Sequence, residues 1–277
     1  MTGIQSRTTL TVTYAMLAVL AFVALFPIAL LLVNSIKASA EIVQNPLAPP
    51  ATPQWVNFRN AWRDASFSRT FLNSAILTGL TILLVCTTSA GAAYALARRK
   101  VGSWKLVTGY LLATTTAPIQ LFLFPLYFAF ARMGLINSVP AVALVYTAIY
   151  SPFAVMLLRT YFLAVPKELE EAALIDGATD WQVFTRVMLP IVSPGILTVA
   201  LIIALNAWNE FLIATTFLQT DERHTAVVSF FQLSGQYSSD WGMIMAAALL
   251  VVLPVVVLFV ALQRRFIEGM AGGSVKG

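Results

Sequence analysis

Long runs of apolar residues divide the chain, and shorter polar segments separate them. A helix needs about 20 apolar residues to cross a hydrocarbon core of about 30 Å. The runs are continuous and do not alternate in short segments, so they predict helices and not the strands of a barrel. We therefore predict an all-α integral membrane protein with six transmembrane helices. The predicted spans cover roughly Val12–Val33, Phe71–Ala97, Leu106–Ala131, Val139–Leu158, Ile191–Phe217 and Gly242–Gln263.

The polar segment between the fourth and fifth runs, Pro166–Pro190, is the one long polar stretch with a helical pattern. Its first part consists mostly of good helix formers and leads to Gly177, which readily takes the left-handed conformation after a helix. Thr179 and Gln182 have the spacing of a capping box, so a second helix should begin just after Thr179. Pro190 should end that helix. The pattern predicts a helix, a turn and a helix, with small residues at the bend that let another backbone approach.

The composition supports a membrane protein and excludes several other classes. The chain is 59% hydrophobic and 10% charged, with a mean hydropathy of +0.82. Soluble domains average about 25% charged residues. The single cysteine, Cys86, excludes a disulfide framework within the chain. The net charge of +5 is spread along the sequence without basic clusters that contain aromatic residues, which argues against nucleic acid as a partner.

The Lys and Arg residues of the loops indicate how the predicted spans are oriented. With the N-terminus inside, 11 of the 17 basic residues lie on the inner side of the membrane and six on the outer side. Loops rich in positive charge stay in the cytoplasm. Both termini and the segment Pro166–Pro190 are therefore predicted to be cytoplasmic, with membrane lipid around the spans.

A spaced motif within Pro166–Pro190 resembles the "EAA" coupling loop of ABC importer permeases. It consists of Glu171-Ala172-Ala173, three residues, Gly177, nine residues, and then Val187-Met188-Leu189-Pro190. The family usually has Ile where this chain has Val187. The resemblance implies the type I ABC importer fold, in which this cytoplasmic helical loop contacts an ATPase. The coupling residues that it implies are Glu171, Ala172, Ala173, Asp176, Gly177, Leu189 and Pro190.

The C-terminal tail, residues 266–277, ends in a sequence that resembles the "GG-V-K-G" tail of the smaller-tailed permease of maltose-type importers. In that family the tail enters the interface of the ATPase dimer. Composition alone would favour a frayed, Gly-rich terminus for the tail. The alternative for the loop is an ordinary amphipathic helical hairpin between two spans. The tail residues implied to contact the ATPase are Gly272, Gly273, Ser274, Val275, Lys276 and Gly277.

Polar and aromatic side chains inside the predicted spans are candidates for a substrate path. Glu210 is the only charged residue in the six runs, and an ionisable residue within a span is by default a functional-site hypothesis. It shares a helical face with Asn206 and Asn209, and it either faces a cavity or pairs with Arg132 or a partner permease. Amides and aromatic rings suit hydroxyl-rich ligands, although they also pack helices together. The candidates are Gln120, Tyr146, Tyr150, Asn206, Asn209 and Glu210.

The run Trp208-Asn209-Glu210-Phe211 resembles a signature common in the carbohydrate branch of these importers. The resemblance as a whole implies the permease subunit of an ATP-driven, binding-protein-dependent importer for a sugar, oligosaccharide or related polyol, in a bacterial or archaeal cytoplasmic membrane. Such an importer contains a second homologous permease, an ABC ATPase homodimer and an extracellular solute-binding protein. This chain has no phosphate-binding G-x-x-x-x-G-K-[ST] motif, so we expect no cofactor in it, with ATP and Mg bound by the ATPase.

Other functions make different demands on the sequence. An importer of glycerol phosphates or phosphodiesters would favour Arg or Lys within the spans; this chain has none there, although a partner permease could supply them. A stand-alone secondary transporter would need coupling charges near the membrane midplane or an inverted repeat. An intramembrane enzyme would need a catalytic pair within the spans. The chain has one His, in a loop, and no metal-binding motif, so neither catalysis nor a metal site is predicted.

Overall fold

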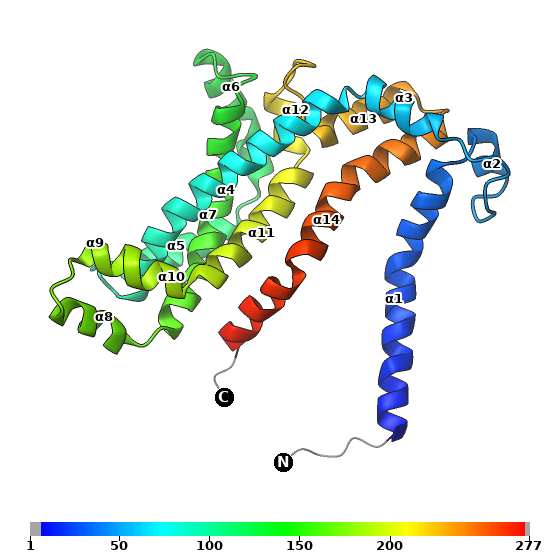
Figure 1. Cartoon of the computed structure of the whole chain (residues 1–277). Coiled ribbons are helices and arrows are strands. Elements are labelled where there is room, and N and C mark those ends of the chain that lie inside the picture. The colour runs from blue at the N-terminus through cyan, green and yellow to red at the C-terminus, as the bar shows by residue number, and fades with distance from the viewer. Residues whose placement is uncertain (1–6, 275–277) are drawn as a thin grey trace. The chain divides into compact units, whose positions relative to one another are not determined.

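The computed structural model describes the backbone of residues 7–274 and the side chains of residues 10–263. All of its regular elements in that range are helices (Figure 1). In chain order they are α1 (Arg7–Ser35), α2 (Ser39–Gln44), α3 (Val56–Asp64), α4 (Phe67–Ala97), α5 (Trp104–Thr116), the 3-10 helix η1 (Ile119–Phe122), α6 (Leu123–Arg132), α7 (Val139–Ala164), α8 (Lys167–Ile175), α9 (Asp180–Gln182), the π-helix η2 (Val183–Met188), α10 (Leu189–Ile191), α11 (Ser193–Asn209), α12 (Leu212–Phe217), α13 (Ala226–Gln236) and α14 (Trp241–Ser274).

Four helices among the described residues are long and apolar enough to cross a membrane. Two further helix pairs meet the same criteria together but are strongly bent between their members, by 88° and 72°. Counting each bent pair as one span gives six. The four are Leu10–Ser35, Phe67–Ala97, Val139–Ala164 and Trp241–Gln263, and the pairs are Trp104–Thr116 with Ile119–Arg132 and Asp180–Ile191 with Ser193–Asn209.

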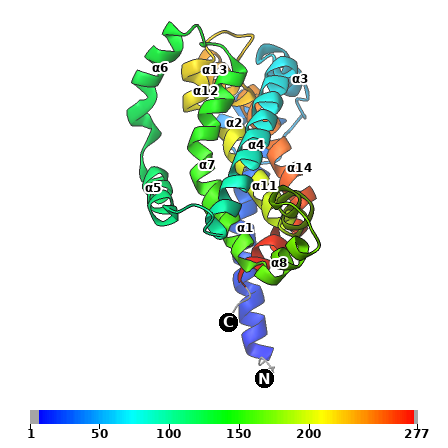
Figure 2. The ribbon, with the colours of Figure 1, turned by 90° about the vertical axis from the view of Figure 1, so that its left-hand side faces the viewer.

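Two predicted runs differ from a continuous helix. The third, predicted as Leu106–Ala131, is interrupted between α5 and η1, where Ala117 has an extended backbone. Pro118 follows, and the residue before a proline is driven out of the helical region; Figure 2 shows α5 and α6 as separate helices beside α7. The fifth, predicted as Ile191–Phe217, consists of α11 and α12 with a break at Glu210.

The chain forms two compact units, of which the first comprises Met1–Phe67 and Phe230–Leu253. Polar contacts organise its short helices. Asn57 donates its amide hydrogens to the carbonyls of Ser35 and Lys37, at 3.0 and 2.9 Å. By contrast, the side chains of residues 10–29 in α1 are exposed within the chain. A helix that is apolar on all sides needs lipid or another subunit around it.

The second unit comprises Ser68–Ser229 and Pro254–Gly277 and holds the predicted coupling loop and substrate-path residues. Its core includes two apolar clusters. One, which includes Leu158, Phe162 and Met188, joins α4 and α7 to the coupling loop. The other, which includes Tyr146 and Phe217, joins α7 to α12. Packing at each end of the unit therefore positions one of the two predicted sites.

Candidate coupling site

The predicted helix and turn are present as α8 and the residues that follow it. Gly177 has a φ of +84°, the left-handed conformation expected of it. Its N–H donates to the carbonyl of Leu174, and that of Ala178 donates to Ala173, both at 3.0 Å, so the turn closes the end of α8. A Cβ atom at Gly177 would meet nothing within 4 Å. Glycine is therefore favoured here by backbone conformation and not by crowding.

The second helix begins as predicted but ends differently. Thr179 and Gln182 form the capping box: the Gln182 N–H donates to Thr179 Oγ1 at 3.3 Å, and the Thr179 N–H donates to Gln182 Oε1 at 2.8 Å. The helix was predicted to end at Pro190; the helical segment runs through the π-helix η2 and α10 and ends at Ile191, one residue later. Pro190 lies in the first turn of α10, where its missing N–H is tolerated. The bend of 72° to α11 follows.

Glu170, which the sequence did not single out, ties α8 to the end of α4. The Tyr94 hydroxyl donates to Glu170 Oε1 at 2.6 Å, and Arg98 Nε donates to Oε2 at 2.7 Å. Lys100 Nζ lies 3.5 Å from Oε1. The side chains of Glu170 and Arg98 are only 11% and 6% exposed. We call Glu170, Tyr94, Arg98 and Lys100 the Glu170 anchor.

The charges of the Glu170 anchor are mutually compensating. Burial by itself would raise the pKa of Glu170, but hydrogen bonds from Tyr94 and Arg98 and the nearby positive charges outweigh it, so the pKa is lowered. Burial likewise opposes the charge of Lys100, yet its hydrogen bond to Asp180, 2.6 Å long, helps to raise the Lys100 pKa to about 12. Glu170 and Lys100 are therefore both charged at neutral pH, and together they hold α8 and α9.

Aromatic packing beneath the loop reinforces the anchor. The ring of Tyr94 lies 5.2 Å from that of Phe184 in η2 and 5.5 Å from that of Phe162 in α7, measured between centroids. Val183 and Met188 of η2 are fully buried. The second half of the loop is thus part of the core of the unit, so a displacement of α8 cannot leave α4 and α7 unaffected.

The opposite face of the loop is exposed and carries most of the predicted coupling residues. Glu171, Ala172, Asp176, Gly177 and Pro190 are exposed, whereas Ala173 and Leu189 are half-buried against the core. Four large apolar side chains of the same loop are exposed, of which Ile175 at 86% and Trp181 at 70% are the most exposed. The sequence analysis missed these two, although apolar residues in a polar loop are themselves a sign of a contact surface.

The predicted tail lies mostly at the edge of the described chain. Gly272, Gly273 and Ser274 form the end of α14. Val275, Lys276 and Gly277 lie outside the described residues. The contact of the tail with an ATPase stays a prediction.

Glu210, the predicted charge of the substrate path, holds the break between α11 and α12. Its Oε1 accepts the Ile213 N–H at 2.8 Å, and its Oε2 accepts the Ala214 N–H at 2.9 Å. The hydroxyl of Tyr146, which is fully buried, donates to Oε2 at 2.7 Å. Glu210 thus caps the N-terminus of α12. The alternative that it pairs with Arg132 is not seen among the described side chains, where that guanidinium lies over the ring of Phe128, 4.4 Å from its centroid.

The other predicted path residues are not drawn into this network. Asn206 and Asn209 are exposed, and each amide donates to the carbonyl four residues earlier, Ile202 or Leu205, at 2.8 Å. Gln120 is exposed on η1. Tyr150 is half-buried, with its ring 5.8 Å from that of Tyr146. The helical face predicted to carry Asn206, Asn209 and Glu210 therefore ends with α11, because the chain leaves the helix at Glu210. The amide atoms of the two asparagines that do not bond their own helix can contact a ligand.

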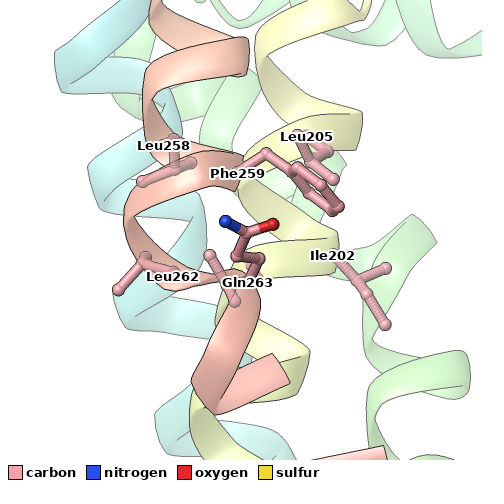
Figure 3. Close-up of a pocket in the computed structure, with 7 residues that line it drawn as sticks. Ile202, Leu205, Leu258, Phe259, Leu262 and Gln263 are labelled. Carbon is pink, nitrogen blue, oxygen red and sulfur yellow. The ribbon is translucent and has the colours of Figure 1, made fainter. Parts of the chain in front are cut away.

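A pocket between α11 and the C-terminal part of α14 is lined by apolar side chains and one amide (Figure 3). Its lining residues are Leu201, Ile202, Leu205, Leu258, Phe259, Leu262 and Gln263. A sugar site needs several convergent hydrogen-bonding groups. One amide does not supply them, so this pocket is not a suitable site for a sugar.

Comparison with known proteins places this arrangement in a family. The model for "Binding-protein-dependent transport system inner membrane component" matches residues 88–272. A diacetylchitobiose uptake system permease protein of Streptomyces coelicolor is 34% identical over 96% of this chain and 88% of its own length. A melibiose/raffinose/stachyose import permease protein of Bacillus subtilis is 34% identical over 94% of each chain. A bacterial ABC transporter involved in import of the acidic polysaccharide alginate has a similar fold, with a TM-score of 0.78 at 20% identity, covering 96% of this chain and 99% of that chain.

Proposed function

Because the chain belongs to the family of binding-protein-dependent transport system inner membrane components, we propose that it carries a carbohydrate across the membrane, driven by ATP that a partner hydrolyses. The chain is a multi-pass membrane protein with the type I importer fold, and its role is transport. The step that this chain itself performs is alternating access, in which its helices open the path to one side and then to the other.

The proposal rests on the different surroundings of two adjacent carboxylates on α8. Glu170 is buried in the Glu170 anchor, whereas Glu171 is exposed beside Ala172 and Gly177. One carboxylate fixes the loop to its own subunit, and the next is free to contact a partner. The Glu171 carboxylate suits an Arg of an ATPase, and the small residues beside it let the two backbones approach closely.

Movement of the loop is transmitted in two directions. The Glu170 anchor leads to α4, and η2 and α10 lead through the 72° bend to α11. Leu189 and Pro190 lie in this second connection. Since α11 carries Asn206 and Asn209 and ends at Glu210, tilting the loop changes the position of the predicted path residues.

We propose the other subunits of the transporter from the same family membership. An ABC ATPase homodimer binds ATP and Mg and contacts both the loop and the tail residues 272–277. A second homologous permease completes the path, and an extracellular solute-binding protein delivers the ligand. Both termini lie in the cytoplasm, as the distribution of basic residues favours.

We propose a sugar, oligosaccharide or related polyol as the substrate. Relatives named for diacetylchitobiose and for melibiose, raffinose and stachyose support this class. The exposed amides of Asn206 and Asn209 and the rings of Tyr146 and Tyr150 are suited to hydroxyls and sugar faces. A glycerol phosphate is less well matched, because the six predicted runs contain no Arg or Lys.

The test is the ATPase activity of the reconstituted complex, with and without the binding protein and with panels of sugars and glycerol phosphodiesters. We expect one sugar with the binding protein to stimulate hydrolysis and drive uptake. Glu171→Ala should abolish the stimulation, and Gly177→Asp should abolish uptake while membrane insertion stays normal. Glu168→Ala, an exposed glutamate one helical turn farther from the bend, is the matched control and should retain both activities. Normal coupling in Glu171→Ala, or no complex with an ATPase, would refute the proposal.

A further inference from the structure

Three cationic side chains converge on one tryptophan at the start of α5. The guanidinium of Arg99 lies 5.0 Å from the ring centroid of Trp104, and that of Arg159 lies 5.8 Å away. Lys105 Nζ lies at 5.7 Å. We call Trp104, Arg99, Lys105 and Arg159 the Trp104 cluster. It joins the loop after α4 to α7, because Arg159 lies near the end of that helix.

The positive charges of the Trp104 cluster lack acidic partners within the described part of the chain. Arg99, Lys105 and Arg159 form no ion pair among the side chains of residues 10–263, and the buried Nε of Arg159 has no hydrogen-bond acceptor there. The nearby carboxylates of Glu170 and Asp180 are held by Arg98 and Lys100. Like charges gathered around one ring repel each other. An anion placed among them would relieve that repulsion and supply the missing acceptor.

The backbone of Arg99 is a second, independent observation. Its φ is +53°, in the left-handed region, directly after α4. The turn is closed by the Lys100 N–H, which donates to the Ala95 carbonyl at 3.0 Å. Glycine is the usual residue at such a position, and an arginine there is strained. Strain at a single residue points to a use for its side chain, and this side chain is directed to Trp104.

The Trp104 cluster lies in surroundings that suit the binding of a lipid headgroup. Arg99 follows the end of the apolar helix α4, and Arg159 lies five residues before the end of α7, about 7.5 Å along the helix axis. On α5, just beyond Trp104, Leu106 is 76% exposed and Tyr110 is 68% exposed. Tryptophan with Lys and Arg is the usual combination at a membrane interface.

We propose that the Trp104 cluster binds the phosphodiester headgroup of an anionic phospholipid, whose acyl chains lie along Leu106 and Tyr110 of α5. The phosphate lies among the two guanidinium groups and the ammonium, and Arg159 Nε donates to one of its oxygens. The exposed apolar side chains next to the cations distinguish a lipid from a soluble phosphate. This site is separate from the proposed transport and coupling functions, although residue 100 joins it directly to the Glu170 anchor.

The test is native mass spectrometry of the purified, full-length transporter complex, released from detergent after titration with phosphatidylglycerol or phosphatidylcholine. We expect phosphatidylglycerol to be retained preferentially. Arg99→Gly, which suits the left-handed backbone, and Arg159→Gln should each weaken phosphatidylglycerol binding about fivefold, the effect of one interfacial charge. Combining them with Lys105→Gln should abolish the preference for phosphatidylglycerol over phosphatidylcholine.

Arg132→Gln is the matched control, because Arg132 also lies over an aromatic ring, that of Phe128, but as a single cation. It should retain the wild-type preference for phosphatidylglycerol. Thermal unfolding of Arg99→Gly in phosphatidylcholine nanodiscs should occur at a temperature no lower than that of wild type, because glycine suits the left-handed backbone, and this separates lost binding from lost folding. Two results would overturn the proposal: the triple variant retaining the wild-type preference, or millimolar glycerol 3-phosphate displacing the lipid from the wild type, since that would indicate a site for soluble phosphate.

Discussion

The second unit contains two tyrosine–glutamate pairs, one at each of its predicted sites. Tyr94 donates to Glu170 at 2.6 Å, and Tyr146 donates to Glu210 at 2.7 Å. Beyond the tyrosine, the partners differ. Glu170 contacts cationic side chains of the loop that follows α4, whereas Glu210 binds two backbone N–H groups of the turn that follows it.

This difference shows two uses of a carboxylate in a membrane protein. Glu170 connects separate elements through charge, so it can transmit a displacement from α8 to α4. Glu210 satisfies the backbone groups that a broken helix exposes, which is needed wherever a chain departs from regular helix within the apolar layer. The first carboxylate therefore joins elements within this chain, α8 to the end of α4, and the second stabilises the break between α11 and α12.

The largest loss in the free energy of unfolding should come from removing the Glu210 carboxylate, which is the hydrogen-bond acceptor at the break between α11 and α12. Glu210→Ala leaves three donors without a partner: the N–H groups of Ile213 and Ala214 and the hydroxyl of Tyr146. Unsatisfied buried donors cost about 1–3 kcal/mol each, so we expect a loss of about 3 kcal/mol or more in the free energy of unfolding. Denaturant titration in detergent, followed by tryptophan fluorescence, measures it. Asn209→Ala, whose side chain only bonds its own helix, should change little, and equal stabilities of the two variants would contradict the prediction.

Neutralising Glu170 in the anchor should cause the next largest loss in the free energy of unfolding. Glu170→Gln leaves Arg98 buried without a counter-charge, and we expect a loss of about 2 kcal/mol in the free energy of unfolding. Because the loop is then loosely joined to α4, substrate uptake per ATP hydrolysed should fall. Glu171→Gln should change the free energy of unfolding by less than about 0.5 kcal/mol and still lose ATPase stimulation. If both variants had the same stability, the two carboxylates would not differ as described.

The anchor should also give the stability of the protein a pH dependence. The pKa of Glu170 is lowered in the folded protein, so its contribution is complete above the ordinary glutamate pKa of about 4.3 and is lost as the pH falls through the lower, folded value. The difference in unfolding free energy between wild type and Glu170→Gln should therefore be constant from pH 6 to 8. It should shrink below about pH 4. A difference that grows with acid would have the wrong sign.

The smallest losses in the free energy of unfolding should come from removing the hydroxyl of Tyr94 or that of Tyr146. Tyr94→Phe removes one donor from a carboxylate that still has its cationic partners, so we expect a loss of about 0.5–1 kcal/mol in unfolding free energy. Tyr146→Phe removes the only side-chain donor that contacts Glu210 among the described residues. The loss should be about 1.5 kcal/mol, because Tyr146 is fully buried and a hydrogen bond in the low-dielectric interior contributes more. Comparing the pair by denaturant titration tests the ranking; the reverse order would contradict it.

Local features of the loop were predictable because they depend on neighbours in sequence. The left-handed Gly177 and the Thr179–Gln182 capping box each involve residues within one helical turn. The bend in the third run also has a local cause, because Pro118 constrains the residue before it. In each case the physical cause lies in the same short stretch of chain as its effect.

The distinction between Glu170 and Glu171 was not predictable in the same way. Both are glutamates on one helix, and which of them is buried depends on Tyr94 and Arg98, more than 70 residues earlier. Glu210 was singled out for its charge, but its partner Tyr146 lies 64 residues away in α7. No proline or glycine lies next to Glu210 in the sequence, so no helix-breaking residue predicts the break there. Sequence patterns therefore located the sites, and only the tertiary contacts separated the roles within them.

The adjacency of Glu170 and Glu171 also constrains how the length of this loop can change. Successive residues of an α-helix are rotated by about 100°, so inserting or deleting one residue between Pro166 and Glu170 would place a different side chain in the anchor and turn the contact residue away from its partner. Substitutions at the exposed positions alter only the outer surface. We therefore expect related chains to tolerate many changes of residue in α8 and very few changes in its length.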